Sequence, residues 1–116
     1  MISRHWKGVT RPGRAADYID HLESETLPTL RRIPGFVSGT ILHRAVAEGT
    51  EFLIVTVWES LEPIQAFVGD ADLEAAVVPE VVKAMMVRYD PQVVHYEVAG
   101  AKPRGKPNSI PSRSVW

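Results

Sequence analysis

The pair His95-Tyr96 brings together two side chains that could handle a proton near the end of the chain. An imidazole titrates close to neutral pH, and a phenol donates a hydrogen bond. The pair lies in the run Val93 to Val98, whose composition predicts a strand. Neighbouring residues on a strand face opposite sides, so only one of the two can enter a given pocket. We expect that residue to act as a catalytic proton acceptor or hydrogen-bond partner for a phenolic substrate. The alternative is a lining residue satisfied by its neighbours.

Four aromatic side chains could form the walls of a pocket for a flat ligand. They lie on expected strands and helices whose apolar faces would meet. Aromatic walls hold planar molecules by stacking, although plain core packing would explain the same residues. The candidate substrate-binding residues are Trp6, Tyr18, Trp58 and Phe67.

Metal and cofactor chemistry have little support in the sequence. The chain has no cysteine, which excludes thiolate catalysis and cysteine-ligated zinc or iron–sulfur centres. His5, His43 and His95 lie on expected strands, and His5 and His95 could approach one another on neighbouring strands. No His-x-His or Glu-x-x-His spacing accompanies them, and no glycine-rich phosphate loop is present. We therefore expect neither a metal nor a bound cofactor, and we expect His21 at the rim of a helix.

These candidates must be positioned by a strand that has two apolar faces. In the run Glu51 to Ser60, one face carries Phe52, Ile54, Thr56 and Trp58, and the other carries Leu53, Val55 and Val57. A small chain can cover one face of an antiparallel sheet with its own helices. Covering the second face requires either more chain or a partner.

The remaining elements follow from hydrophobic periodicity and turn residues. We expect strands at Ile2 to Val9 and Phe36 to Val46, and a first helix that starts near Pro12 and is interrupted at Pro28. Ser60 would cap a second helix, followed by a short helix over 72–76 and another that contains 81–86. The resulting order β-α-β-β-α-β is a ferredoxin-like α+β unit. Its open, apolar sheet face predicts a homodimer.

Composition and charge divide the chain into a body and an arm. Residues 1–100 carry nine basic and fourteen acidic side chains, a balance of −5, whereas residues 101–116 carry four basic side chains and no acidic one. An acidic body argues against a nucleic-acid partner. The lack of a membrane-length apolar run or a signal peptide predicts a cytoplasmic protein without a membrane partner. We expect one domain over 1–99 and a basic Pro/Gly/Ser-rich arm over 100–116.

The sequence resembles the antibiotic biosynthesis monooxygenase family. The resemblance rests on Val57-Trp58-Glu59-Ser60 at the end of the central strand, Pro34-Gly35-Phe36 before the second strand and Val94 to Val98 at the end. It spans roughly residues 1–99. It implies a dimeric α+β barrel with a pocket between sheet and helices in each subunit. It also implies a cofactor-independent monooxygenase acting on a small aromatic or quinol-like compound.

Two alternatives accompany this interpretation. Because no strongly polar catalytic cluster is visible, the chain could be a non-catalytic dimeric barrel that binds a small hydrophobic or aromatic molecule or serves a stress or pathway-accessory role. The heme-degrading branch of the family implies an asparagine in the first strand and a histidine ligand after the third. Trp6 and Val77 stand at about those positions, and an apolar side chain cannot ligate iron. The resemblance thus argues against heme degradation by that mechanism, and the residues leave open whether the chain is an enzyme.

Overall fold

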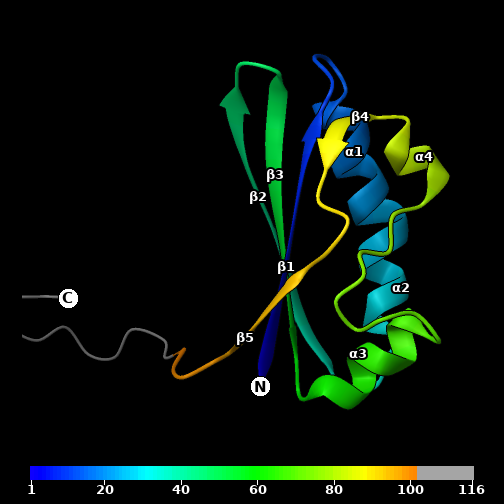
Figure 1. The fold of residues 1–116 in the computed structure, drawn as a ribbon, viewed down its shortest axis with the longest axis vertical. Coiled ribbons are helices and arrows are strands. Elements are labelled where there is room, and N and C mark those ends of the chain that lie inside the picture. The colour runs from blue at the N-terminus through cyan, green and yellow to red at the C-terminus, as the bar shows by residue number, and fades with distance from the viewer. Residues whose placement is uncertain (102–116) are drawn as a thin grey trace, which may run out of the picture.

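The computed structural model of the protein describes residues 1–101 and shows one antiparallel sheet with helices on one of its faces (Figure 1). This architecture confirms the predicted α+β, ferredoxin-like fold class. The expected arm lies almost entirely outside the described residues. The strands are β1 (Ile2–Thr10), β2 (Phe36–Val46), β3 (Gly49–Trp58), β4 (Met86–Tyr89) and β5 (Val94–Glu97). The helical segments are α1 (Ala15–His21), η1 (Leu22–Thr26), α2 (Leu27–Arg31), α3 (Leu61–Val68) and α4 (Glu80–Lys83).

The strand order is β2-β3-β1-β4, and β5 also pairs with β1. β4 pairs with the Gly8–Thr10 end of β1 and β5 with its Ile2–His5 end. The two short strands therefore share one edge of β1 and together replace a single fourth strand. β4 was missed because Met86 continues the apolar pattern of the preceding helix. Its pairing with Thr10 overrides that local pattern.

The first helical region runs from Ala15 to Arg31 without a break, which corrects the predicted interruption at Pro28. Pro28 has no N–H with which to bond the preceding turn. It lies in the first turn of α2, and the five residues before α2 form the π-helical turn η1. The region thus changes its hydrogen-bond pattern and stays helical.

The segment between α3 and α4 is irregular, so the short helix predicted over 72–76 is wrong. The Asp72 carboxylate accepts a hydrogen bond from the Glu74 backbone N–H, at 3.1 Å, which forms a local turn. Ala75 then pairs with Gln92 in an isolated bridge. Ser60 precedes α3 in an extended conformation as expected, but its side chain makes no capping hydrogen bond.

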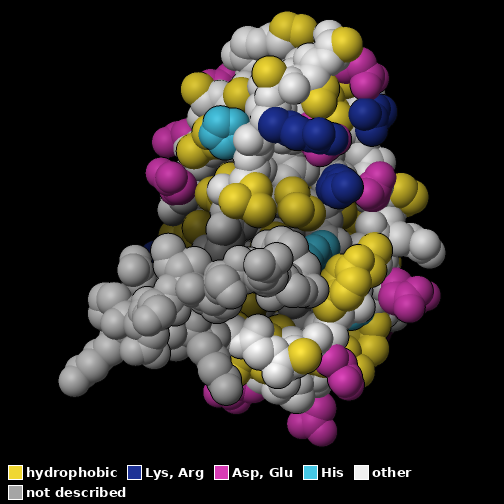
Figure 2. Space-filling model, turned by 90° about the vertical axis from the view of Figure 1, so that its left-hand side faces the viewer, with side chains coloured by type: hydrophobic (Ala, Val, Ile, Leu, Met, Phe, Trp, Pro, Cys, Tyr) yellow, Lys and Arg dark blue, Asp and Glu magenta, His cyan; other side chains and the backbone are white. Residues whose placement is uncertain are grey.

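The sheet has a helix face and an open face. Phe52, Ile54 and Trp58 pack into clusters with helix side chains, as the alternation along β3 predicts. The open face carries Leu42, Leu53, Val55, Val57, Val94 and Tyr96. The helices of residues 1–101 lie on the other side of the sheet (Figure 1), and Figure 2 shows hydrophobic side chains near the middle of the open face. Within residues 1–101 no helix has the length and apolar character that crossing a membrane requires.

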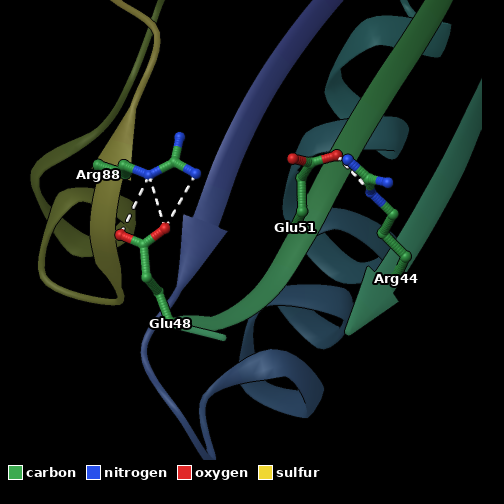
Figure 3. A network of polar contacts seen from close by, with 4 residues as sticks. All are labelled: Arg44, Glu48, Glu51 and Arg88. Carbon is green, nitrogen blue, oxygen red and sulfur yellow. Dashed lines mark hydrogen bonds and ion pairs between the residues drawn. The ribbon is translucent and has the colours of Figure 1, made fainter. Parts of the chain in front are cut away.

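Two ion pairs mark one end of the open face, next to the β2–β3 hairpin (Figure 3). Arg44 Nε donates to Glu51 at 2.9 Å, and Arg88 Nε donates to Glu48 at 3.1 Å. The two carboxylates raise the pKa of the arginine that each contacts. Because these pairs are largely exposed, they contribute little to stability. They do give this end of the apolar face a polar border.

Candidate functional site

A cavity of about 100 Å³ lies between the helix face of the sheet and the helices. All four aromatic candidates line it: Trp6 from β1, Tyr18 from α1, Trp58 from β3 and Phe67 from α3. An apolar cavity of roughly 150 Å³ accepts a benzene molecule, so this smaller cavity must widen to hold even a single ring and would have to widen much further for a fused system. The wall opposite the sheet includes Val77 and Val78 from the irregular segment before α4.

Hydrogen bonds fix the two tryptophans of the aromatic wall, Trp58 and Trp6. Trp58 is fully buried and lies nearly parallel to Phe67, with ring centroids 5.9 Å apart. Its indole Nε1 donates to the Thr56 hydroxyl at 2.9 Å. The indole Nε1 of Trp6 donates to the Asp90 carbonyl at 2.7 Å. These bonds satisfy both indole donors and leave the rings to face the cavity with apolar surface.

Tyr18 adds a hydroxyl to this wall. Its ring packs edge-on against Phe52, with centroids 4.9 Å apart, and the residue is almost completely buried. Burial raises the pKa of the Tyr18 phenol, so the group stays protonated at all physiological pH values. Tyr18 lines the cavity, so its protonated hydroxyl can donate a hydrogen bond to a ligand oxygen there.

Arg4 is the residue of the site that the sequence interpretation missed. It lines the cavity from β1 and is only 5% exposed. Its Nη1 donates to the Leu73 carbonyl at 2.6 Å and to His95 Nε2 at 2.9 Å, and its Nη2 donates to the Ala75 carbonyl at 2.9 Å. Burial lowers the pKa of the guanidinium, which nevertheless remains charged at neutral pH. Strand alternation was the available signal, because it places Arg4 on the same face as Trp6.

The two catalytic candidates lie on opposite faces of the sheet, as their adjacency on a strand requires. His95 is opposite Arg4 and reaches the cavity only through that side chain. Burial and the charge of Arg4 lower the His95 pKa, and the Glu74 carboxylate opposes this change. Tyr96 is on the open face, 55% exposed, with its ring 4.9 Å from that of His5. Within one chain Tyr96 has no access to the cavity.

The predicted approach of His5 to His95 is wrong. His5 pairs with Val94, whereas His95 pairs with Arg4, so the two imidazoles lie on different faces. His5 Nε2 instead lies 2.8 Å from the Ser3 hydroxyl. Among residues 1–101, no three histidine, aspartate or glutamate side chains are grouped closely enough to hold a metal ion.

His21 is the histidine that lines the cavity. It is the last residue of α1 and is half-buried, which agrees with the predicted rim position. It shares the cavity wall with Thr26 of η1 and Thr56 of β3. The site thus combines an aromatic wall with one guanidinium, one imidazole, one phenol and two hydroxyl groups. It contains no carboxylate among its lining residues.

The sequence model of one family, "Antibiotic biosynthesis monooxygenase", matches residues 1–78. The chain belongs to the antibiotic biosynthesis monooxygenase family. This confirms the resemblance found from the central strand. A search among curated proteins returns no significant match.

Three solved structures share the fold of the chain at low sequence identity. A mutant of SnoaB, a cofactor-independent oxygenase from Streptomyces nogalater, superposes with a TM-score of 0.63 at 13% identity, covering 89% of this chain and 97% of that chain. A protein of unknown function from Nitrosomonas europaea gives 0.61 at 21% identity, covering 90% and 95%. The heme-degrader MhuD from Mycobacterium tuberculosis, with two hemes bound, gives 0.56 at 16% identity, covering 89% and 100%. At these identities the matches show the fold alone.

Proposed function

We propose that the protein is a cofactor-independent monooxygenase that acts on a small aromatic or quinol-like compound in the cavity. The observation that carries the proposal is the convergence of Trp6, Tyr18, Trp58 and Phe67 on one cavity between the sheet and the helices. Family membership and the fold shared with SnoaB, itself a cofactor-independent oxygenase, support it.

The proposed reaction needs little from the protein beyond a dry and oriented pocket. An ionised phenol donates an electron to O₂, and the two radicals combine to a hydroperoxide at a ring carbon that carries hydrogen. Loss of water then leaves a quinone, so that one oxygen atom enters the product and the other leaves as water. The substrate supplies all the electrons, which is why no cofactor is required. Exclusion of water by the aromatic wall prevents the intermediate from reacting elsewhere.

We assign the roles within the site as follows. Trp58 stacks on the substrate ring, and Trp6 and Phe67 close the ends of the cavity. The Tyr18 hydroxyl donates to the substrate oxygen. His21 lines the cavity and is the candidate base, whereas His95 acts through Arg4. Tyr96 would contribute only across an interface on the open face.

A homodimer through the open face belongs to the same proposal. The apolar side chains of that face have no cover among residues 1–101, and Leu42, Val94 and Tyr96 are each about half exposed. A sheet from an identical subunit would bury them and produce the dimeric barrel that the family resemblance implies. The polar border at Arg44 and Arg88 would set the edge of that interface.

Heme is a second substrate class, suggested by the fold shared with MhuD. His21 offers an imidazole in the cavity wall, while Val77 lies in the same wall and provides no ligand. A cavity of about 100 Å³ would have to expand far more for a porphyrin than for a single ring. The single-ring substrate therefore agrees better with the geometry.

The test combines oxygen uptake with tryptophan fluorescence, using methylhydroquinone as substrate and a protein-free control for autoxidation. We expect saturable quenching together with oxygen uptake above the control, and a clear loss of uptake in Tyr18→Phe. Lys83→Gln on the surface of α4 should leave both signals unchanged. Quenching without oxygen uptake would contradict an oxygenase and favour the non-catalytic binding protein. Absence of quenching by methylhydroquinone and heme alike would contradict any ligand role of the cavity.

A further inference from the structure

Arg4 places an unneutralised positive charge in a cavity that is otherwise mostly apolar. Its three hydrogen-bond acceptors are two backbone carbonyls and an imidazole, all of them uncharged. No ion pair within residues 1–101 includes Arg4, whereas Arg14, Arg44 and Arg88 are each paired with a carboxylate. A buried cation is costly unless an anion compensates it. The fold therefore retains a charge for which residues 1–101 supply no counter-ion.

The guanidinium also has hydrogen-bond donors to spare. Its five N–H groups form a rigid fork, and the three bonds above use both donors of Nη1 and one of Nη2. One Nη2 donor and the Nε donor have no partner among residues 1–101. Arg4 lines the cavity, so a ligand bound there would lie beside the guanidinium.

The three bonds hold the guanidinium in a fixed position. Leu73 and Ala75 lie in the irregular segment that leads to the cavity wall, and His95 lies on the neighbouring strand. A cation fixed in this way needs no rearrangement when a ligand binds. Charge-assisted hydrogen bonds to such a group are among the strongest in proteins.

We propose that the cavity selects single-ring aromatic compounds with an ionised oxygen substituent and binds that oxygen at the free donors of Arg4. The shared chemistry is an anionic oxygen on the ring, either a phenolate or a carboxylate. Tyr18 donates a second hydrogen bond from the opposite wall, and Trp58 holds the ring. The inference rests on the proposed function, in that it takes this cavity as the substrate site, but binding itself involves no oxygen.

This assignment gives Arg4 a direct role in the proposed reaction. A guanidinium beside a phenol stabilises the phenolate and lowers the phenol pKa. The phenolate is the form that gives an electron to O₂, so binding at Arg4 would also prepare the substrate. Neutral rings of the same size would lack both the hydrogen bonds and the activation.

The first experiment compares benzoate with benzamide by tryptophan quenching of the wild-type protein. The two molecules have the same ring and almost the same size, and they differ in charge. We expect benzoate to bind at least about tenfold more tightly, as a charge-assisted pair with a buried cation allows. Equal affinities, or binding of benzamide alone, would overturn the inference. Neither result depends on oxygen uptake. The preference for benzoate can therefore be absent while the oxygenase activity is present, and it can be present while the oxygenase activity is absent.

The second experiment removes the charge. Arg4→Gln should abolish the preference for benzoate, and Arg14→Gln, which removes a surface arginine paired with Asp17, should preserve it. Because Arg4 also holds two carbonyls, circular dichroism must show that Arg4→Gln is folded. If it is not, Arg4→Lys, which keeps the charge, should retain a reduced preference. A folded Arg4→Gln protein that still prefers benzoate would overturn the inference, as would loss of the preference in a folded Arg4→Lys protein.

A third ligand separates the two kinds of anion. 4-Nitrophenol absorbs differently as phenol and as phenolate, so its ionisation can be followed while it is bound. We expect the protein to lower its pKa by about one unit, through the neighbouring guanidinium. Benzoate preference with an unchanged nitrophenol pKa would overturn the phenolate part and leave a carboxylate site.

Discussion

At the scale of single residues, the contact between Arg4 and His95 determines which protonation state the fold favours. Arg4 Nη1 can donate to His95 Nε2 only when that nitrogen carries no proton. Burial and the Arg4 charge both lower the His95 pKa. Folding therefore selects the neutral imidazole, which keeps a second positive charge away from the cavity.

This coupling predicts that stability falls as the solution becomes acidic. A histidine with a lowered pKa in the folded state contributes stability above its ordinary pKa of about 6.5, and the contribution is lost as pH falls through the folded pKa. We expect His95→Gln, which keeps an acceptor but does not titrate, to reduce the loss of stability between pH 7.5 and pH 5.5. Urea unfolding at the two pH values measures it. His5, whose pKa is also lowered by burial, should contribute separately, so His5→Gln is the companion variant. An unchanged pH dependence in His95→Gln would contradict the assigned contact.

Trp58 gives the second prediction at this scale. The side chain is fully buried between Phe36 and Phe67, and it also bonds Thr56. Trp58→Ala should lower the free energy of unfolding by about 3–5 kcal/mol, since it opens a large cavity. Leu61→Ala, an exposed apolar residue at the start of α3, should change it by less than about 0.5 kcal/mol. Urea denaturation measures both, and a mild effect of Trp58→Ala would show that the core tolerates an empty site.

At the scale of elements, the close approach of β3 to the end of β1 depends on Gly49. Its φ of +152° is one that side chains rarely adopt, and a Cβ there would lie 1.9 Å from the Thr10 carbonyl oxygen. Gly13 also has a positive φ, +81°, but a Cβ there would meet nothing within 4 Å. A side chain at Gly13 would therefore cause backbone strain alone, whereas one at Gly49 would cause backbone strain and a steric clash.

We predict that Gly49→Ala is much more destabilising than Gly13→Ala. The second substitution should cost about 1 kcal/mol for its backbone conformation. The first adds a collision with backbone that cannot move aside, and we expect several kcal/mol or failure to fold. Thermal unfolding of both variants measures the difference. Similar melting temperatures would contradict the described contact between β3 and β1.

The sequence predicted those elements whose local pattern and tertiary environment agree. β3 has a long two-sided apolar run, and its alternation correctly placed Phe52 and Trp58 toward the helices. β4 was missed because its four residues continue an apolar helical pattern, and only pairing with β1 makes them a strand. Pro28 was expected to break a helix because the alternative, a π-helical turn before it, has no sequence signal.

The sequence likewise identified some residues of the candidate site and not others. Aromatic size and strand alternation were sufficient to identify Trp6, Tyr18, Trp58 and Phe67, which line one cavity. Arg4 was not identified because its partners Leu73 and Ala75 are about seventy positions away and contribute only backbone carbonyls. Contacts with backbone carbonyls cannot be predicted from the types of the residues that supply them.

At the scale of the whole molecule, the uncovered sheet face predicts the assembly. Leu42 of the edge strand β2 and Leu53 of β3 are opposite one another on that face. We expect the wild-type protein to be a dimer by light scattering and Leu42→Glu to shift it toward the monomer, since a buried unpaired charge is unfavourable. Val81→Glu, on the exposed side of α4, should leave the dimer intact. A monomeric wild-type protein would contradict the assembly.

The central claim is that the cavity beside Arg4 receives an aromatic ligand. A crystal structure of the protein grown with methylhydroquinone in the absence of oxygen tests it most directly. We expect a ring between Trp58 and Tyr18, with one oxygen within hydrogen-bond distance of the Arg4 guanidinium. A cavity filled by the protein's own side chains, with the ligand bound elsewhere or not at all, would contradict it.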